Sequence, residues 1–243
     1  VKWAPGKAGA ALHLQNNAVT INKVGAFERD QKFSYGAWLK LPHGGTGGII
    51  AKMNAPSTHQ GYDLWLENKQ LAVHIIHNWP QNYLKVRTKQ AFPNNKWFHV
   101  MVTYDGSSKA AGVKIYIDGK SVPLETLGDN LTKSINTTVP LRLGKRNQMQ
   151  PVPNMQVSEL KVYNRAVTAG EVNRLFNANF MKSLLALPAP NPQQLKQIRE
   201  YYYSTVDTKG IAINKRLQSI KQEKQVVDSR ATITLVMKEN AGK

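Results

Sequence analysis

The sequence predicts a mainly β protein, a sandwich or jelly roll, with a helical appendage at its C-terminal end. Short apolar or alternating runs separated by turn residues fill residues 1–179, which is the pattern of half-buried strands. Asp105-Gly106 and Asp118-Gly119 directly follow two of these runs, and glycine there supplies the positive φ of a tight turn. After Pro188 and Pro190 the apolar residues recur at helical spacing, so the chain is expected to change from strands to helices there.

Ten strands are expected in this first part, at a spacing typical of a sandwich or jelly roll. They cover residues 11–14, 33–41, 48–53, 61–67, 71–76, 83–89, 97–104, 113–118, 140–144 and 157–163. Trp38 and Trp97 lie in apolar strand patterns, so we expect both in the core. Thr168 and Glu171 have the spacing of a capping box, which predicts a short helix at the end of the sandwich.

Residues 180–243 are expected to form a two-helix connector. Asn191 is a helix N-cap, Pro192 occupies the first helical position and Gln194 the third, which predicts the start of the first helix. The second helix follows Gly210 and has one apolar face, formed by Ile213, Leu217, Ile220 and Val227. Residues 233–237 have a strand pattern but no partner within the connector, so we expect this strand to belong to a following domain.

The net charge of +18, from 33 basic and 15 acidic residues, favours polyanionic partners such as acidic glycans, nucleic acid or anionic surfaces. The absence of cysteine excludes disulfides, thiolate metal clusters and a cysteine nucleophile. No run approaches the roughly 20 apolar residues of a membrane-spanning helix, so we expect no membrane span. No pattern typical of a specific nucleic-acid-binding motif is present, so the hypothesis of nucleic-acid binding rests on the net charge alone.

Six motifs in a fixed order carry a family resemblance. They are Gly9-Ala-Ala-Leu12-His-Leu14, Phe33-Ser-Tyr-Gly-Ala-Trp38-Leu-Lys40, Trp97-Phe-His99-Val-Met-Val-Thr-Tyr104-Asp105-Gly106, Lys114-Ile-Tyr116-Ile-Asp118-Gly119, Leu141-Arg-Leu-Gly144, and Leu160-Lys-Val-Tyr163-Asn-Arg165-Ala-Val-Thr168 with Glu171. Together they resemble the concanavalin A-like lectin/glucanase superfamily, specifically its laminin-G-like domains. The resemblance covers residues 1–179 and implies a two-sheet antiparallel jelly-roll sandwich from a family mostly occupied with binding glycans, proteins or lipids.

A narrower resemblance is to the form of this domain found in large planctomycete proteins that also carry cytochrome-c-like domains. The residues that carry it are Ala51-Lys-Met-Asn54, Gly61-Tyr-Asp-Leu64, His74-Ile-Ile-His-Asn-Trp79-Pro80, Lys85-Val-Arg-Thr-Lys89 and Thr234-Leu-Val-Met-Lys-Glu239. This resemblance implies that the chain is one piece of a larger multidomain protein. It also implies a location in the cell envelope or outside the cell.

Carboxylate spacing argues against an enzyme. Some members of the superfamily hydrolyse polysaccharides with a Glu-x-Asp-x-x-Glu motif on one strand, and the nearest match, Glu28-Arg-Asp30, lacks the third carboxylate and lies in a loop. Asp63 and Glu67 share a strand but lie about 13 Å apart along it, beyond the range of either glycosidase geometry. We therefore expect no catalytic residues.

Metal binding is likewise not expected. His74 and His77 are three residues apart on a strand, so their side chains point to opposite faces. His99 follows Trp97 on another strand, with its ring on the same face as that tryptophan. These residues are expected to be structural histidines. A structural calcium ion is the alternative, because laminin-G-like domains often hold one at the sandwich rim, and Asp63, Asp105 and Asp129 are the available donors here.

The expected ligand site lies around residues 77–89. Strict alternation predicts Leu84 and Val86 in the core and a basic ladder on the opposite face, made of Tyr83, Lys85, Arg87 and Lys89. Just before it, Trp79 falls in a hairpin loop between His77 and Asn82, where an exposed ring beside polar donors suits a pyranose. Trp65 is expected on the same outer face as Asp63 and Glu67.

These residues support two hypotheses. The first is a non-catalytic carbohydrate-binding module for an acidic or sulfated polysaccharide, which would target a larger protein. The second is a structural or protein-interaction spacer without glycan affinity, in which Trp79 caps the sandwich edge and the lysines are a solvated face.

Overall fold

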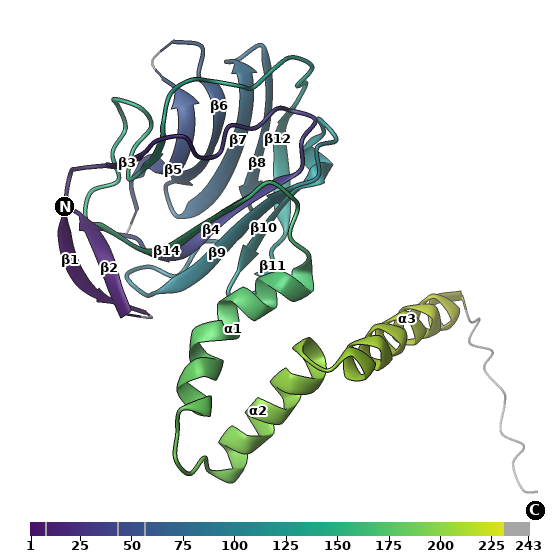
Figure 1. Cartoon of the computed structure of the whole chain (residues 1–243). Helices are drawn as coiled ribbons and strands as arrows, with labels where there is room; N and C mark the ends of the chain where they lie inside the picture. Colours follow the sequence, from purple (N-terminus) through teal and green to yellow (C-terminus); the bar gives the residue numbers. More distant parts are fainter. Residues whose placement is uncertain (8, 43, 56, 231–243) are drawn as a thin grey trace, which may run out of the picture. The chain divides into compact units, whose positions relative to one another are not determined.

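A computed structural model describes residues 1–230 except 8, 43 and 56 (Figure 1). The chain divides into two compact units, Val1–Asn179 and Phe180–Lys243. The first unit contains all the strands described below. The second contains most of the helical residues. No helix among the described residues combines the length and apolar character needed to cross a membrane.

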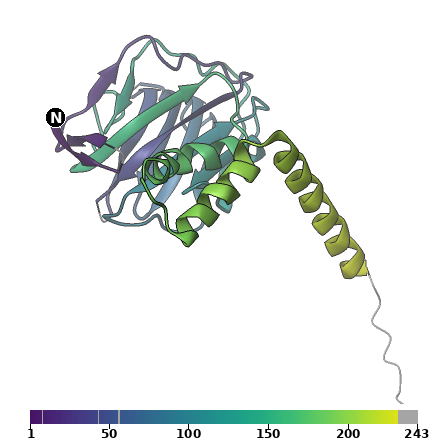
Figure 2. The ribbon, with the colours of Figure 1, turned by 60° about the horizontal axis from the view of Figure 1, so that its bottom comes forward.

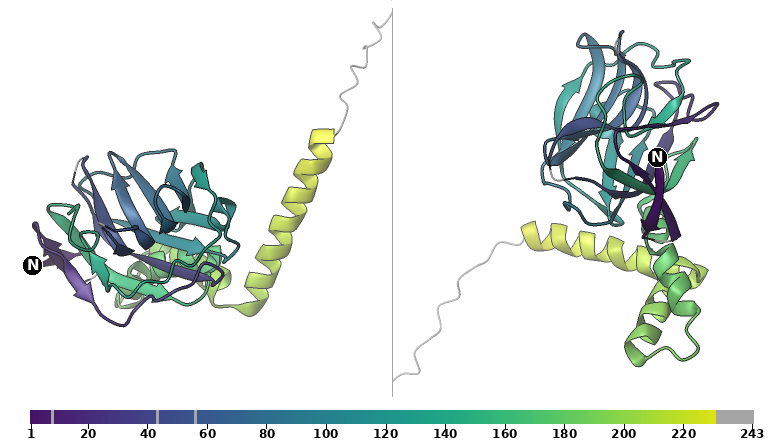
Figure 3. Two further views of the ribbon diagram at one scale, coloured as in Figure 1. Left: turned by 90° about the horizontal axis from the view of Figure 1, so that it is seen from above. Right: turned by 90° about the vertical axis from the view of Figure 1, so that its left-hand side faces the viewer.

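The first unit is a sandwich of two antiparallel seven-stranded sheets, stacked face to face (Figure 3). We call the sheet with the order β1-β2-β14-β4-β9-β10-β11 sheet A and the sheet with the order β12-β8-β7-β6-β5-β13-β3 sheet B. The strands are β1 (Lys2–Gly6), β2 (Gly9–Leu14), β3 (Val19–Ile21), β4 (Phe33–Lys40), β5 (Thr46–Asn54), β6 (Gln60–Glu67), β7 (Gln70–Asn78), β8 (Asn82–Thr88), β9 (Phe98–Tyr104), β10 (Val113–Ile117), β11 (Lys120–Ser121), β12 (Leu124–Asp129), β13 (Leu141–Leu143) and β14 (Met155–Tyr163). The predicted two-sheet antiparallel jelly-roll sandwich is confirmed.

All ten expected strands are present, each within two residues of its expected ends. The four strands that were not expected are β1, β3, β11 and β12, and each lies at the edge of a sheet. Edge strands are short or half-exposed, so they carry little of the apolar alternation from which a strand is predicted.

The main core lies between the two sheets. Its largest fully buried side chains include Phe33, Tyr35, Tyr62, Phe98 and Tyr104. Aromatic contacts link these residues across the sheets; the rings of Phe33 and Tyr62 lie 5.0 Å apart, for example. Burial of this many large apolar groups is the dominant stabilising contribution to such a sandwich.

Helix α1 (Ala169–Leu185) begins at the predicted capping box and covers part of the outer face of sheet A (Figures 1 and 2). The Thr168 backbone N–H donates to the Glu171 carboxylate at 2.8 Å, and the Glu171 N–H donates to Thr168 Oγ1 at 3.3 Å. The Phe176 ring of α1 lies 5.5 Å from the ring of Trp38 on β4. Trp38 is therefore buried under a helix rather than between the sheets.

Two expectations, on Trp97 and on the length of α1, are corrected. Trp97 is only half-buried, because β9 begins one residue later and Phe98 fills the core position. Helix α1 is longer than expected, because its apolar residues continue to Met181 and Leu184, which are both buried.

The second unit contains the end of α1, then α2 (Pro192–Thr205) and α3 (Thr208–Arg230). The capping box of Asn191 and Gln194 is present as predicted. Helix α3 starts two residues before Gly210, because the Asp207 carboxylate accepts a hydrogen bond from the Gly210 N–H and so caps the first turn. The predicted strand at residues 233–237 lies outside the described residues.

Candidate functional site

The outer face of sheet B carries a row of polar side chains. Strand register places Asp63 of β6 opposite His74 of β7, and His74 opposite Lys85 of β8. In the neighbouring row Trp65 pairs with Ala72, and Ala72 with Arg87. Because side chains alternate between the faces of a sheet, these residues point away from the core that their strand neighbours fill.

Asp63, His74 and Arg146 form a buried charged cluster at the centre of this face. Arg146 comes from the loop after β13; its Nε donates to Asp63 Oδ2 at 2.5 Å, and His74 Nδ1 lies 2.8 Å from Asp63 Oδ1. Asp63 is fully buried, Arg146 is 7% exposed and His74 is 4% exposed. Burial alone would raise the pKa of Asp63, but the charge of Arg146 and the hydrogen bonds from His74 and Arg146 outweigh it and lower that pKa to about 2.

Burial lowers the pKa of the histidines near this cluster, whereas it raises the pKa of a carboxyl group. It lowers the pKa of His74, and although Asp63 opposes the shift, the net direction remains downward. The pKa of His59 is also lowered, first by burial and then by the charge of Arg146. The cluster therefore holds an ionised aspartate, a cationic arginine and a histidine that resists protonation.

Arg146 also covers Trp65. The guanidinium carbon lies 3.8 Å from the centre of the Trp65 ring, and the indole is only 6% exposed. Trp65 lies on the predicted face, but its ring is packed under Arg146. A direct ligand contact from this ring would require Arg146 to move.

Trp79 lies in the hairpin between β7 and β8 and is 40% exposed. Its backbone N–H donates to the Thr58 carbonyl at 3.0 Å, which ties the hairpin to the loop after β5. The indole lies 4.5 Å from the ring of Tyr83 and 6.0 Å from the ring of His74. The ring of Tyr83 lies over Gly128 of β12, where a Cβ would overlap it. We call Trp79 and Tyr83 the aromatic platform.

Of the predicted basic ladder, Lys85 and Arg87 lie on β8, and both are paired with acidic side chains. Lys85 Nζ lies 3.1 Å from the Glu67 carboxylate, and Arg87 Nη1 lies 3.5 Å from the same group. Arg87 Nε also donates to Glu125 Oε1 of β12 at 2.7 Å. Lys89 lies beyond the end of β8 and is exposed. Leu84 and Val86 are in the core, as the alternation predicts.

His77 and Asn82 are engaged by the segment after β12. His77 Nδ1 lies 2.6 Å from the Ser134 carbonyl oxygen. The Asn82 amide nitrogen donates to Thr132 Oγ1 at 2.7 Å, and its oxygen accepts from the Thr132 backbone N–H at 3.1 Å. These two side chains therefore hold the end of the hairpin in place in this structure.

Three of the carboxylates considered for catalysis or calcium, those of Glu28, Asp105 and Asp129, accept hydrogen bonds from backbone N–H groups. Asp105 Oδ1 accepts from the Ser107 N–H at 2.9 Å, and Asp129 Oδ1 accepts from the Ala110 N–H at 2.9 Å. Glu28 accepts from the Ile135 N–H at 2.9 Å. No three His, Asp or Glu side chains among the described residues gather as metal ligands would.

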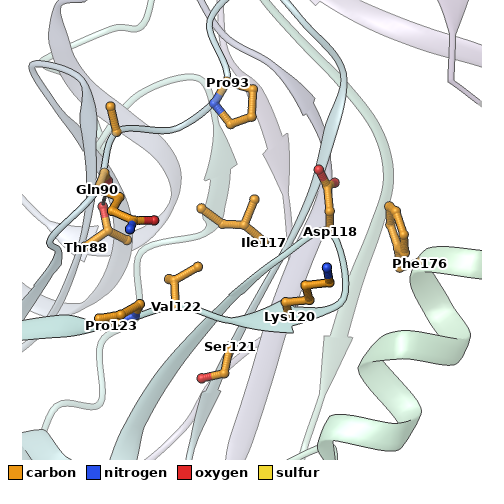
Figure 4. A pocket seen from close by; sticks show the side chains of 11 residues that line it. Thr88, Gln90, Pro93, Ile117, Asp118, Lys120, Ser121, Val122, Pro123 and Phe176 are labelled. Carbon is orange, nitrogen blue, oxygen red and sulfur yellow. Dashed lines mark hydrogen bonds between the residues drawn. The ribbon is translucent and has the colours of Figure 1, made fainter.

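A separate pocket of about 580 Å³ lies at another place in the sandwich (Figure 4). The end of β8, strands β10 and β11 and helix α1 all contribute to it. Its apolar wall includes Ile117, Val122 and Phe176, and Gln90 and Lys120 are among its polar groups. None of the ligand residues predicted from sequence lines this pocket.

Sequence reasoning missed Arg146 and His59. Arg146 lies 83 positions from Asp63 in the chain, in an irregular loop. No periodicity connects such a loop to a strand, so the only available signal was the isolated acid on β6, which needs a cationic partner if it is buried.

The fold and the half-open aromatic surface define a lectin-like β-sandwich. A family profile, described as the concanavalin A-like lectin/glucanases superfamily, matches residues 14–173. The chain belongs to this superfamily. No curated protein matches it at a significant level.

Solved structures with the same fold include three toxin binding domains. The binding domain of Paraclostridial Mosquitocidal Protein 1 is 18% identical with a TM-score of 0.57, over 74% of this chain and 46% of that one. The botulinum neurotoxin serotype G binding domain is 16% identical with a TM-score of 0.53, over 72% and 46%. The serotype D ligand-binding domain, solved with N-acetylneuraminic acid, is 14% identical with a TM-score of 0.53, over 72% and 44%. This chain thus spans less than half of each.

Proposed function

We propose that this chain is a non-catalytic carbohydrate-binding module, and the exposed aromatic platform is the observation that carries the proposal. The ring of Trp79 is 40% exposed and is braced by Tyr83 at 4.5 Å. A pyranose packs its C–H face on such a ring, while polar side chains nearby bond its hydroxyls. Gln81 lies in the same hairpin, and the half-buried His59 follows Thr58, whose carbonyl accepts a hydrogen bond from the Trp79 N–H.

The ligand in this proposal is an acidic or sulfated polysaccharide. Residues 1–180 carry a net charge of +12 by count, which attracts polyanions over distances up to the screening length of about 8 Å at physiological salt. Lys85 and Arg87 contribute to binding only by exchanging Glu67 for an anionic group of the ligand, because Glu67 now occupies both. The preference for acidic over neutral glycans is therefore smaller than it would be if Lys85 and Arg87 were unpaired.

The comparisons support the proposal at the level of the fold. One similar structure was solved with N-acetylneuraminic acid, and another concerns botulinum neurotoxin type C, whose cell entry depends on interaction with two ganglioside molecules. Both of these ligands are acidic sugars or carry them. The module would act in the cell envelope or outside the cell, attaching a larger multidomain protein to its polysaccharide.

Binding to matched sulfated, uronic-acid and neutral oligosaccharides tests this function, with the wild type and two tryptophan variants. Trp79→Ala should weaken binding about tenfold, because the stacking surface is lost. Trp3→Ala is the matched control, since Trp3 is 75% exposed on β1 of sheet A and should leave affinity unchanged. Equal loss in both variants, or no binding to any glycan by the wild type, would contradict the proposal.

The alternative function is a spacer between neighbouring domains. The favouring observation is that α2 has no buried residue, while Leu195, Tyr202 and Tyr203 on it are about half-exposed. A spacer predicts no glycan affinity in the assay above. It also predicts that unfolding of the helices shifts to higher temperature when the flanking segment of the parent protein is restored.

A further inference from the structure

Helix α3 carries an apolar seam that α2, in the same unit, leaves exposed. Ile213, Leu217, Ile220 and Val227 follow one another at intervals of four, three and seven residues. With Lys224 in the gap, these positions alternate by four and three, which is the a/d pattern of a coiled coil. The four apolar side chains are 44% to 67% exposed, so α2, in the same unit, does not pack over them.

Lys224 is accommodated in this seam by its own helix. Its Nζ lies 2.5 Å from Asp228 Oδ2, one turn further along α3. This pair draws the ammonium group to the side of the helix and leaves the aliphatic stem over the seam. A single lysine at an a position is a device that selects partner register in coiled coils, at some loss of stability.

The charges that flank the seam distinguish between the two ways of pairing α3 with a second α3. Arg216 and Glu223 occupy equivalent g positions, and Lys221 and Asp228 occupy equivalent e positions. Parallel pairing would set each g residue against the e residue of the other helix: Arg216 against Lys221, and Glu223 against Asp228. Both of those contacts are repulsive.

Antiparallel pairing reverses this result. When Leu217 packs against Ile220 of the second copy, Arg216 faces Glu223 of that copy, and the two-fold axis generates the same ion pair twice. Ile213 then packs against the stem of Lys224. Each apolar seam residue from 213 to 220 has a partner, and each g-position charge faces its opposite.

We propose that α3 is a self-association surface, and that its occupant is a second copy of the same helix in antiparallel orientation. The helix has 23 residues and the seam spans about two heptads, so the association is weak and concentration-dependent. The proposal does not depend on glycan binding. It would give an assembled protein two copies of the sandwich.

Sedimentation equilibrium of the full chain, from roughly 10 µM to roughly 1 mM, tests the proposal with charge variants of α3. The wild-type mass should rise from one chain toward two. Arg216→Glu and Glu223→Arg should each weaken the dimer about tenfold or more, because both ion pairs become repulsive. The double variant should return to within about threefold of the wild type. Lys215→Glu makes the same charge change on the outward side and should have less than about threefold effect.

Each other result overturns the proposal. A single-chain mass at every concentration excludes self-association through α3. Tighter association of Arg216→Glu indicates parallel pairing, because that change relieves the Arg216–Lys221 repulsion. A dimer that survives Leu217→Asp and Ile220→Asp uses another surface. These side chains are about half-exposed, so far-ultraviolet circular dichroism should show the same helix content in all variants.

Discussion

The two sheets of the sandwich share their size but differ in what lies on their outer faces. On sheet A, Trp38 is 3% exposed and lies beneath Phe176 of α1. On sheet B, Trp79 is 40% exposed and rests on Tyr83, and no described helix of the first unit lies over it. Trp38 packs against a helix, whereas Trp79 remains partly exposed.

The difference follows from the side chains beside each ring. On sheet A the outer face presents Met101 of β9 and Tyr116 of β10, which pack with Val172 of α1 in a small apolar cluster. The outer face of sheet B instead presents Asp63, which is paired with Arg146, and Lys85, which is paired with Glu67. An apolar face requires a cover from its own chain, whereas a face with paired charges can stay in contact with water or sugar.

The largest effect should come from the buried cluster of sheet B. Asp63→Asn leaves Arg146 buried without its counterion, and breaking a buried pair in this way costs about 3–5 kcal/mol of unfolding free energy. Urea unfolding measures it. Glu200→Gln is the control, because its pair with Lys196 is exposed at 3.9 Å and should contribute less than about 0.5 kcal/mol. A change below about 1 kcal/mol for Asp63→Asn would show that this face does not depend on the cluster.

The unfolding free energy should depend on pH through His99, which lies on the covered outer face of sheet A. Burial lowers the pKa of His99 to about 4, and the charge of Lys161 adds to the shift. Between pH 6.5 and 4 the unfolded chain binds a proton that the folded chain does not, so stability falls as the pH falls through this window. His99 can contribute up to about 3 kcal/mol of that loss.

His99→Gln provides the comparison for this slope. Unfolding free energies at pH 7 and pH 4.5 should differ less in the variant than in the wild type, whatever its absolute stability. His74, whose pKa is also lowered by burial, retains its share of the slope in both proteins. An identical slope in the two proteins would mean that His99 does not titrate as its burial indicates.

A smaller effect on glycan affinity should show how much the basic side chains of sheet B contribute, apart from stacking on Trp79. Glu67→Gln releases Lys85 and Arg87 from their shared carboxylate, so affinity for a sulfated glycan should rise about threefold to tenfold and fall more steeply with salt. Glu159→Gln is the matched control, since it frees Lys161 on sheet A. Isothermal titration at two salt concentrations measures both. Unchanged affinity in Glu67→Gln would exclude the ladder from the ligand surface.

Local patterns predicted much of this molecule. Strand alternation located Leu84 and Val86 in the core, and capping chemistry located the starts of α1 and α2, because these signals are contained within a few residues. The exposed Trp79 followed from its place in a hairpin. The pairing of Lys85 with Glu67 and the cover of Arg146 over Trp65 depend on contacts between distant segments, and no local pattern encodes them.

The same limit explains the two tryptophans that were expected in the core, Trp38 and Trp97. Trp38 and Trp97 both lie in apolar runs, yet Trp38 is buried by α1, which arrives more than 130 residues later in the chain. Trp97 is half-buried because β9 begins one residue after it. Alternation gives the face of a side chain, but not what covers that face.

The most direct test follows the tryptophan side chains while a glycan is added. In a ¹⁵N-labelled protein the indole N–H signals of Trp79 and Trp38 can be assigned through Trp79→Phe and Trp38→Phe variants. An acidic oligosaccharide should shift the Trp79 signal in proportion to saturation and leave the Trp38 signal in place, because α1 covers Trp38. Saturable binding that leaves the Trp79 signal unmoved would contradict the claim that the open face of sheet B is the glycan site.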